Sequence, residues 1–138
     1  MPAADIIHDA VKNALIKDGW TITADPYVIK YKDAKLLADL GAERPLAAER
    51  AGRKIIVEIK SFLGPSPFHD FKLALGQYEL YRRLLQLSAP DRKLFLAISD
   101  LVNVGIFGRE SIQEIVEFLQ LSLLVVDLSK EEIVQWIN

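Results

Sequence analysis

Apolar residues that recur at three- and four-residue steps predict three helices in this chain. The first is expected over residues 5–18, where Asp18-Gly19 supplies a C-terminal stop. The second is expected over 67–87, because Ser66-Pro67 combines a side-chain cap with the one helical position that welcomes proline. The third is expected over 110–119. One predicted helix therefore lies at the start of the chain, one in its middle and one near its end.

Runs of β-branched and aromatic residues between turn signals predict the strands. Ala51-Gly52 is expected to form a hairpin turn that leads from residues 46–50 into a strand over 55–62, which makes those two segments antiparallel. Ser129 and Glu132 fit a capping box for a short last turn that contains Trp136. The remaining strands are expected over residues 20–23, 27–32, 35–43, 93–99 and 122–128.

This order of elements predicts an α/β (α+β) fold, with a mixed β-sheet flanked by helices and an αβββαβ core. The 138 residues fit a single domain over 1–138, because one hydrophobic core of this size is near the usual domain length. A content of 51% hydrophobic and 26% charged residues, with only 7 Gly and 6 Pro, is typical of a compact folded protein.

The composition narrows the classes of function. The first ten residues carry acids where a signal peptide has basic residues, and no apolar stretch approaches the ~18 residues of a membrane span, so a cytoplasmic location and no membrane partner are expected. The absence of cysteine excludes disulfides, thiolate zinc sites and a cysteine nucleophile. The two histidines are far apart in the sequence, which argues against a histidine-rich metal site. A metal in this protein is therefore expected on oxygen ligands.

The charges are unevenly distributed, although the net charge is only −2. Residues 30–60 hold eight Lys or Arg against five acids, and residues 61–93 hold five against three. The last 45 residues hold two against seven. A basic middle can attract a polyanion, but solvated surface charge explains the same pattern, and charge alone favours that second explanation.

Glu58 and Lys60 interrupt the most β-prone run in the chain. Because alternate side chains of a strand share a face, Ile56, Glu58 and Lys60 are expected on one side and Ile55, Val57 and Ile59 on the other. A carboxylate suits Mg²⁺, and a neighbouring ammonium suits a developing phosphoryl charge, so the pair fits phosphodiester hydrolysis. That chemistry needs a second carboxylate, and the alternative is an ordinary strand with one wet face.

The context of this pair resembles a known family. The segments DGWTIT, DLGAE, VEIKSF and ALGQYELYR, in this order and over nearly the whole chain, resemble the XisH family of fdxN element excision controlling factors. An acid, then E-x-K on a core strand, then a helix with Q-x-x-x-Y is similar to the PD-(D/E)xK nuclease superfamily, which has the restriction-endonuclease-like fold.

The resemblance implies roles for individual residues. Glu58 would be a metal ligand, Lys60 the catalytic ammonium, Asp39 the preceding acid and the Ile59 carbonyl a further ligand of Mg²⁺ or Mn²⁺. Asp39 follows an alanine where the family pattern has proline. The first acid of the motif could therefore be Glu43 or Glu49 instead, and Asp39 could be only a turn residue.

The helix and the basic residues complete the expected site. Gln77 and Tyr81 are four residues apart and share a helix face, where they could position a phosphate or the lysine, although a core tyrosine with a satisfied amide is the alternative. His8 is expected to be a surface or hydrogen-bonding histidine. Contacts to a DNA backbone are expected beside the site, from residues that surround the predicted turn: Arg44, Arg50, Arg53 and Lys54.

The resemblance also implies partners. It predicts a protein that acts on DNA with an XisI-type partner protein and a site-specific recombinase complex, during excision of a DNA element in heterocyst differentiation in cyanobacteria. A homodimer is expected, because cutting both strands usually takes two sites. Two functions stay open: a Mg²⁺-dependent nuclease, and a non-catalytic docking or DNA-binding subunit that keeps the nuclease fold.

Overall fold

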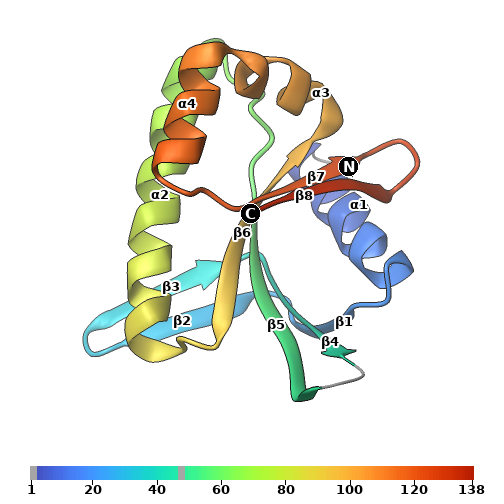
Figure 1. The fold of residues 1–138 in the computed structure, drawn as a ribbon, viewed down its shortest axis with the longest axis vertical. Coiled ribbons are helices and arrows are strands. Elements are labelled where there is room, and N and C mark those ends of the chain that lie inside the picture. Colours follow the sequence, from blue (N-terminus) through green and yellow to red (C-terminus); the bar gives the residue numbers. More distant parts are fainter. Residues whose placement is uncertain (1–2, 47–48) are drawn as a thin grey trace.

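A computed structural model describes residues 3–46 and 49–138, with side chains over 5–44 and 52–138. One helix precedes five successive strands, and helices and strands are interspersed in the rest of the chain (Figure 1). In order they are α1 (Ala3–Lys17), β1 (Thr21–Ala24), β2 (Tyr27–Tyr31), β3 (Ala34–Ala38), β4 (Leu40–Leu46), β5 (Glu49–Ile59), α2 (Pro67–Ser88), β6 (Arg92–Ser99), α3 (Asp100–Val104), the 3-10 helix η1 (Ile106–Gly108), α4 (Glu110–Phe118), β7 (Leu123–Asp127) and β8 (Glu132–Ile137).

The strands form a mixed six-stranded sheet in the order β1-β4-β5-β6-β7-β8, while β2 and β3 form a separate two-stranded sheet. Strand β5 pairs parallel with β6, and β6 parallel with β7, whereas the other pairs are antiparallel. The expected mixed sheet flanked by helices is confirmed. Within the described residues, none of the helices has the length and apolarity that a membrane crossing needs.

Each face of the large sheet is covered by its own helices, and a separate core lies on each side (Figure 1). Helix α1 packs on one face, where Ile55 and Val57 of β5 are buried with Phe95 of β6. Helices α2, η1 and α4 cover the other face, where Ile56 points. The hydrophobic run in β5 is thus buried on both sides, as is usual for a central strand with a parallel neighbour.

The predicted hairpin turn at Ala51-Gly52 is wrong. Both residues lie inside β5, and Gly52 has a φ of 67°, which glycine adopts without a steric penalty. Pairing shifts there, because Arg44 lies opposite Arg53 but Leu46 lies opposite Glu49. This shift is a β-bulge, which accommodates Gly52 within the strand. The residues that connect β4 to β5, 47–48, lie outside the described residues. The predicted antiparallel pairing of β5 with the preceding strand is confirmed.

The expected last helical turn is also wrong, because residues 132–137 form strand β8. Ser129 donates from its backbone N and its Oγ to the Asp127 carboxylate, which makes a turn instead of a helix cap. Trp136 then packs its ring 4.9 Å from that of Phe95. Burial of this aromatic against the α1 side of the sheet favours the extended pairing with β7.

Candidate active site at the carboxyl end of β5

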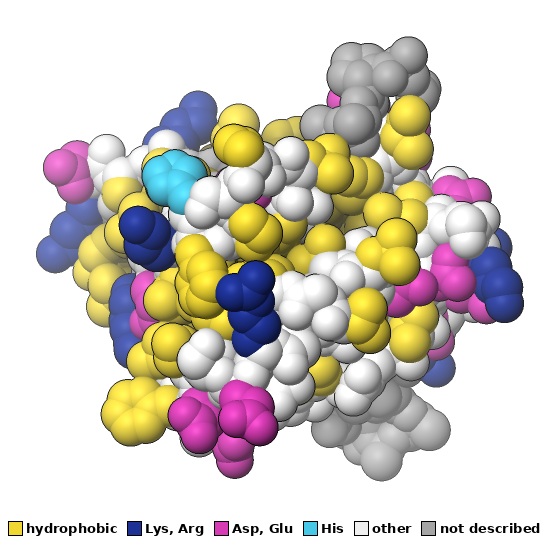
Figure 2. All heavy atoms as spheres, turned by 90° about the horizontal axis from the view of Figure 1, so that it is seen from above, with side chains coloured by type: hydrophobic (Ala, Val, Ile, Leu, Met, Phe, Trp, Pro, Cys, Tyr) yellow, Lys and Arg dark blue, Asp and Glu magenta, His cyan; other side chains and the backbone are white. Residues whose placement is uncertain are grey.

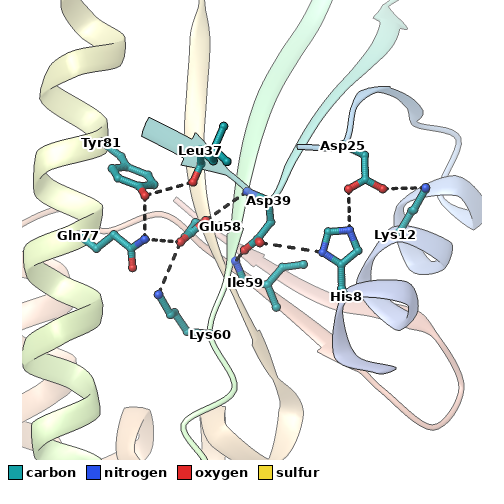
Figure 3. Close-up of polar contacts among 10 residues, drawn as sticks. All are labelled: His8, Lys12, Asp25, Leu37, Asp39, Glu58, Ile59, Lys60, Gln77 and Tyr81. Atoms are coloured by element: carbon teal, nitrogen blue, oxygen red, sulfur yellow. Dashed lines mark hydrogen bonds and ion pairs between the residues drawn. The ribbon is translucent and has the colours of Figure 1, made fainter. Parts of the chain in front are cut away.

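Glu58 is a buried carboxylate near the end of β5. Glu58 is 5% exposed. The alternative, in which this side chain lies on the solvent-exposed face of an ordinary strand, is therefore wrong. The carboxylate points to the α2 side and accepts two hydrogen bonds, one from the Asp39 backbone N at 3.2 Å and one from Gln77 Nε2 at 2.6 Å (Figure 3). Buried carboxylates persist in proteins when such donors satisfy them.

Asp39 lies at the corner where the chain leaves the small sheet and enters the large one. Residues 35–43 were expected as one strand, but the chain breaks at Asp39, between β3 and β4. The break is fixed by an exchange of bonds, since Ile59 N donates to Asp39 Oδ2 at 2.7 Å while Asp39 N donates to Glu58. The structure therefore places the two carboxylates side by side, and Asp39 forms the turn as well.

Lys60 completes the group from the strand side. Its Nζ lies 3.6 Å from Glu58 Oε2, and its side chain is 31% exposed. Its backbone N donates to Ala97 O at 3.1 Å, which extends the parallel pairing with β6 by one residue and fixes the strand direction. The predicted alternation thus brings Glu58 and Lys60 together on the α2 face.

Gln77 and Tyr81 hold the carboxylate from α2. Gln77 Nε2 also donates to the Tyr81 hydroxyl at 2.9 Å, and that hydroxyl donates to Leu37 O at 3.1 Å. The amide orientation is therefore fixed by a chain of bonds from β3 through Tyr81 and Gln77 to Glu58 (Figure 3). Tyr81 is a core tyrosine, 7% exposed, and part of the site.

The electrostatics of the pair favour a bound cation or proton. Burial above all, and then the adjacent Asp39 carboxyl, raise the pKa of the Glu58 carboxyl to about 8, while Lys60 acts in the opposite direction. Two adjacent carboxyl groups, such as those of Asp39 and Glu58, resist simultaneous ionisation because like charges repel. A divalent cation would relieve the same repulsion.

His8 was expected to be a surface or hydrogen-bonding residue, and the structure adds a link to the site. Its Nδ1 lies 4.0 Å from Asp39 Oδ1, and its Nε2 lies 2.8 Å from Asp25 Oδ1. Lys12 donates to the other oxygen of Asp25, and this hydrogen bond lowers the pKa of that carboxyl. Sequence spacing contains no signal for this contact, because α1 meets Asp39 only through the tertiary fold.

The donor set fits a hard divalent cation. Asp39 and Glu58 supply carboxylate oxygens, the ligands that Mg²⁺ prefers. The Ile59 N–H points toward Asp39, and the carbonyl of the same strand residue faces the same side. No cluster of three or more His, Cys, Asp or Glu residues suited to a metal occurs in the part of the chain that the structure describes, so water and substrate oxygens would have to complete the coordination.

Three cavities open beside these residues, and one of them, of about 220 Å³, lies between Lys60 and Leu101. Another of about 230 Å³ is lined by Lys60, Asp70 and the segment 61–64, and a smaller one of about 100 Å³ is lined by His8, Asp39 and Ile59. Lys60 and Asp39 therefore each border open space.

The other acids considered for the first position lie elsewhere or are not described. Glu43 pairs in register with Lys54, and its carboxylate lies 3.3 Å from Arg92 Nη2. The side chain of Glu49 lies outside the described residues. Among the described candidates, only Asp39 approaches Glu58.

The basic residues expected to border the site lie at the opposite end of β5. Lys54 precedes Glu58 by four strand residues, which is about 13 Å. Arg44 and Arg53 face each other in register one residue further away. The side chain of Arg50 lies outside the described residues. Of the groups predicted from the sequence, the structure assembles Asp39, Glu58, Ile59, Lys60, Gln77 and Tyr81 and separates them from the arginines.

Replacing Tyr81 with Phe removes the hydroxyl that orients Gln77 and satisfies Leu37 O. We expect the free energy of unfolding to fall by about 1–2 kcal/mol, since two partly buried hydrogen bonds of this hydroxyl are lost. Urea denaturation of Tyr81→Phe beside Tyr31→Phe tests this, because the Tyr31 hydroxyl makes no hydrogen bond to any residue that the structure describes. An equal loss of unfolding free energy in the two variants would contradict the hydrogen bonds from Tyr81 to Gln77 and Leu37.

Comparison with known proteins agrees with the resemblance noted in the sequence. The family model described as XisH protein matches residues 1–134. An XisH family protein from Nostoc punctiforme is 39% identical, and the match covers 97% of this chain and 100% of that one with a TM-score of 0.88. A fdxN element excision controlling factor protein from Anabaena variabilis is 41% identical, and the match covers 97% and 99% with a TM-score of 0.87.

No curated protein gives a significant match. The family model nevertheless spans almost all of the chain, and two solved structures share both the fold and well over 30% of the sequence. This chain therefore belongs to the XisH family.

Proposed function

We propose that this protein is an excision-controlling factor that acts on DNA through a PD-(D/E)xK-type, metal-dependent nuclease site. The observation that carries the proposal is the buried Glu58 carboxylate with Asp39 beside it and the Lys60 ammonium 3.6 Å away. A protein that kept this fold only for docking would have no evident need to bury Glu58 beside a second acid and a lysine, because an uncompensated buried charge is destabilising.

Each residue of the site has a distinct role in the proposed reaction. Asp39, Glu58 and the Ile59 carbonyl would hold Mg²⁺ or Mn²⁺. When bound, the ion would polarise a phosphate and lower the pKa of a coordinated water. Lys60 would stabilise negative charge on the phosphoryl oxygens, while Gln77 and Tyr81 keep the Glu58 carboxylate in place. An XisI-type protein and a recombinase complex are the proposed partners, and a homodimer would bring two sites to the two DNA strands.

A second candidate is a non-catalytic subunit that docks other proteins or DNA. The upper face of the molecule, above the carboxyl ends of the parallel strands, supports it, because hydrophobic side chains are spread over this face (Figure 2). Leu63, Leu101 and Val104 are 68%, 76% and 75% exposed. Contiguous exposed apolar surface is typical of protein interaction sites.

Metal binding separates the two candidates. We expect Mn²⁺ to raise the melting temperature of the purified protein, since an ion that binds only the folded state stabilises it. Asp39→Asn should abolish this increase, whereas Asp33→Asn, an exposed acid in the β2–β3 turn, should keep it. No increase in the unaltered protein, together with no conversion of supercoiled plasmid in Mn²⁺, would refute the nuclease function and leave the docking function.

A further inference from the structure

A large cavity lies on the α2 side of the sheet, between α4, the end of α3 and strand β8. It has a volume of about 760 Å³. Its floor is apolar, because Phe107, Leu121 and Leu123 are buried there and Ile137 is partly buried beside them. Val104, which is 75% exposed, continues this apolar lining to the surface. An apolar floor that opens to an exposed apolar side chain is typical of a surface that another molecule covers.

The rim of this cavity is polar without being basic. Glu117 is the one charged residue among the described residues that line it. A peptide backbone offers donors and acceptors together, and side-chain amides match both, whereas phosphates are bound mainly by Lys and Arg. The rim therefore favours a protein segment over a nucleic acid. Five amide side chains surround the floor: Asn103, Gln113, Gln120, Gln135 and Asn138.

An acidic face of α4, made of Glu110, Glu114 and Glu117, runs beside the cavity. These residues are four and three positions apart, which places them on one side of the helix, and all three are exposed. The face extends about 10 Å along the helix axis. It forms no ion pair within the part of the chain that the structure describes. The three carboxylates are therefore open to a partner.

This arrangement of charges is unfavourable for the helix by itself. Like charges three or four residues apart repel, and a carboxylate near the C-terminal end, such as that of Glu117, opposes the helix dipole. Two arginines close in sequence or space are engaged elsewhere, since Arg82 pairs with Glu79 and the Arg109 guanidinium lies 4.8 Å from the Phe68 ring centroid. Cations of a binding partner would relieve the repulsion along the acidic face.

We propose that this cavity and the acidic face of α4 form a docking site for a partner protein, which contributes a segment with apolar side chains next to Lys or Arg. The apolar side chains cover the floor, the amides of the rim bond the backbone of the segment, and its cations face the three glutamates. The acidic face repels the phosphates of DNA. A two-fold dimer through this surface would bring two acidic faces into one interface, which like-charge repulsion opposes.

A partner docked here would lie beside the candidate active site. In register, Glu58 lies opposite Leu96, Leu96 opposite Leu123, and Leu123 opposite Ile137. Three strand spacings separate Glu58 from Ile137, which is about 14 Å. The docking surface is thus distinct from the metal-dependent chemistry proposed for Glu58, and it would serve a nuclease and a non-catalytic subunit alike.

Selection from a library of random peptides displayed on phage tests the chemistry of the partner. With the purified protein in EDTA as bait, we expect the enriched peptides to combine Lys or Arg with Leu, Ile, Phe or Trp. The most enriched peptide is then synthesised and added to ¹⁵N-labelled protein. The backbone amide signals of Gln113, Glu117 and Gln135 should shift, while those of Asp70 and Leu73, beside Lys60, should stay in place.

Neutralising the acidic face tests the role of charge. We expect the fluorescent peptide to bind about tenfold more weakly, by anisotropy, when all three glutamates of the face are changed to Gln, since each exposed ion pair contributes modestly. The variant is Glu110→Gln with Glu114→Gln and Glu117→Gln. A control with the same change of net charge neutralises three exposed acids outside α4 and should bind within about twofold: Asp5→Asn with Asp9→Asn and Asp33→Asn.

Val104→Ser tests the apolar part of the surface. We expect it to weaken binding of the same peptide about fivefold, because the valine side chain loses water on binding and a serine gains less from that transfer. Its exposure of 75% makes the substitution tolerable for the fold. Leu87→Ser, which changes a 59% exposed leucine near the end of α2, is the control and should leave the affinity unchanged.

Three results would overturn the proposal: no enrichment of peptides that combine basic and apolar residues, unshifted signals at the cavity, or equal affinities of the acidic-face variant and its control. Shifts of the same signals on addition of a DNA duplex would assign the surface to nucleic acid instead. Shifts that grow with the concentration of the protein alone would assign it to a second copy of this chain. Loss of cleavage or metal binding in Asp39 or Glu58 variants leaves these measurements unaffected, so the two proposals fail separately.

Discussion

Lys60→Ala is expected to lower the rate at which supercoiled plasmid is nicked in Mg²⁺ or Mn²⁺ by about 10²–10³-fold, the usual effect of removing one group that stabilises transition-state charge. The ammonium lies 3.6 Å from Glu58 and is partly exposed, so it can face a phosphate while the carboxylate stays buried. The substitution truncates a side chain at the cavity rim, so the melting temperature should change little.

A gel assay of plasmid forms over time measures this rate. Lys72→Ala, which removes an exposed lysine from the first half of α2, is the matched control and should stay within about twofold, because one exposed charge affects only nonspecific attraction to DNA. Nicking that persists at the original rate in Lys60→Ala would belong to a contaminant, and the nuclease proposal would fail.

Glu58→Gln is expected to change how the stability of the metal-free protein depends on pH. In the unfolded chain this carboxyl ionises near its ordinary pKa of 4.5, but in the folded protein burial and Asp39 raise its pKa to about 8. Between these values the folded state holds one more proton than the unfolded state, so the free energy of unfolding falls as pH rises. The fall attributable to Glu58 is on the order of 3–5 kcal/mol across the window.

A glutamine at position 58 cannot ionise, so this part of the pH dependence should disappear. At pH 5, where Glu58 is protonated, the variant should be less stable than the original protein by about 1 kcal/mol, because both oxygens of the carboxyl group can still accept a hydrogen bond and the amide NH₂ cannot. Above pH 8 the order should reverse. Urea denaturation from pH 5 to 9 in EDTA measures both curves, with Glu114→Gln, an exposed acid of α4, as the control that keeps the original slope. Parallel curves for Glu58→Gln and the original protein would show that the carboxyl ionises normally.

Several elements were predictable because their causes are local. The Ser66-Pro67 signal placed the start of α2 correctly, since a serine cap that bonds His69 N and a proline at the first position act within one helical turn. The alternation of β5 placed Glu58 and Lys60 on one face for the same reason, because strand geometry fixes it. The Q-x-x-x-Y spacing likewise placed Gln77 and Tyr81 together.

Other features depend on contacts between distant segments. Ser129 and Glu132 form a helix-start pattern, yet pairing with β7 and burial of Trp136 make residues 132–137 a strand. The break of the chain at Asp39 depends on bonds to Ile59 and Glu58, about twenty residues later in the sequence. The link from His8 to Asp39 depends on the packing of α1 against the large sheet.

The sequence by itself determined the mixed helix and strand architecture, the shared face of Glu58 and Lys60 and the position of Gln77, because propensity, capping and strand alternation act over a few residues. Only the tertiary structure decided which acid joins Glu58, that His8 lies near that acid, and that Arg44, Arg53 and Lys54 lie at the far end of β5 from the site. Those choices arise from sheet order and register, which place together side chains that are far apart in the chain.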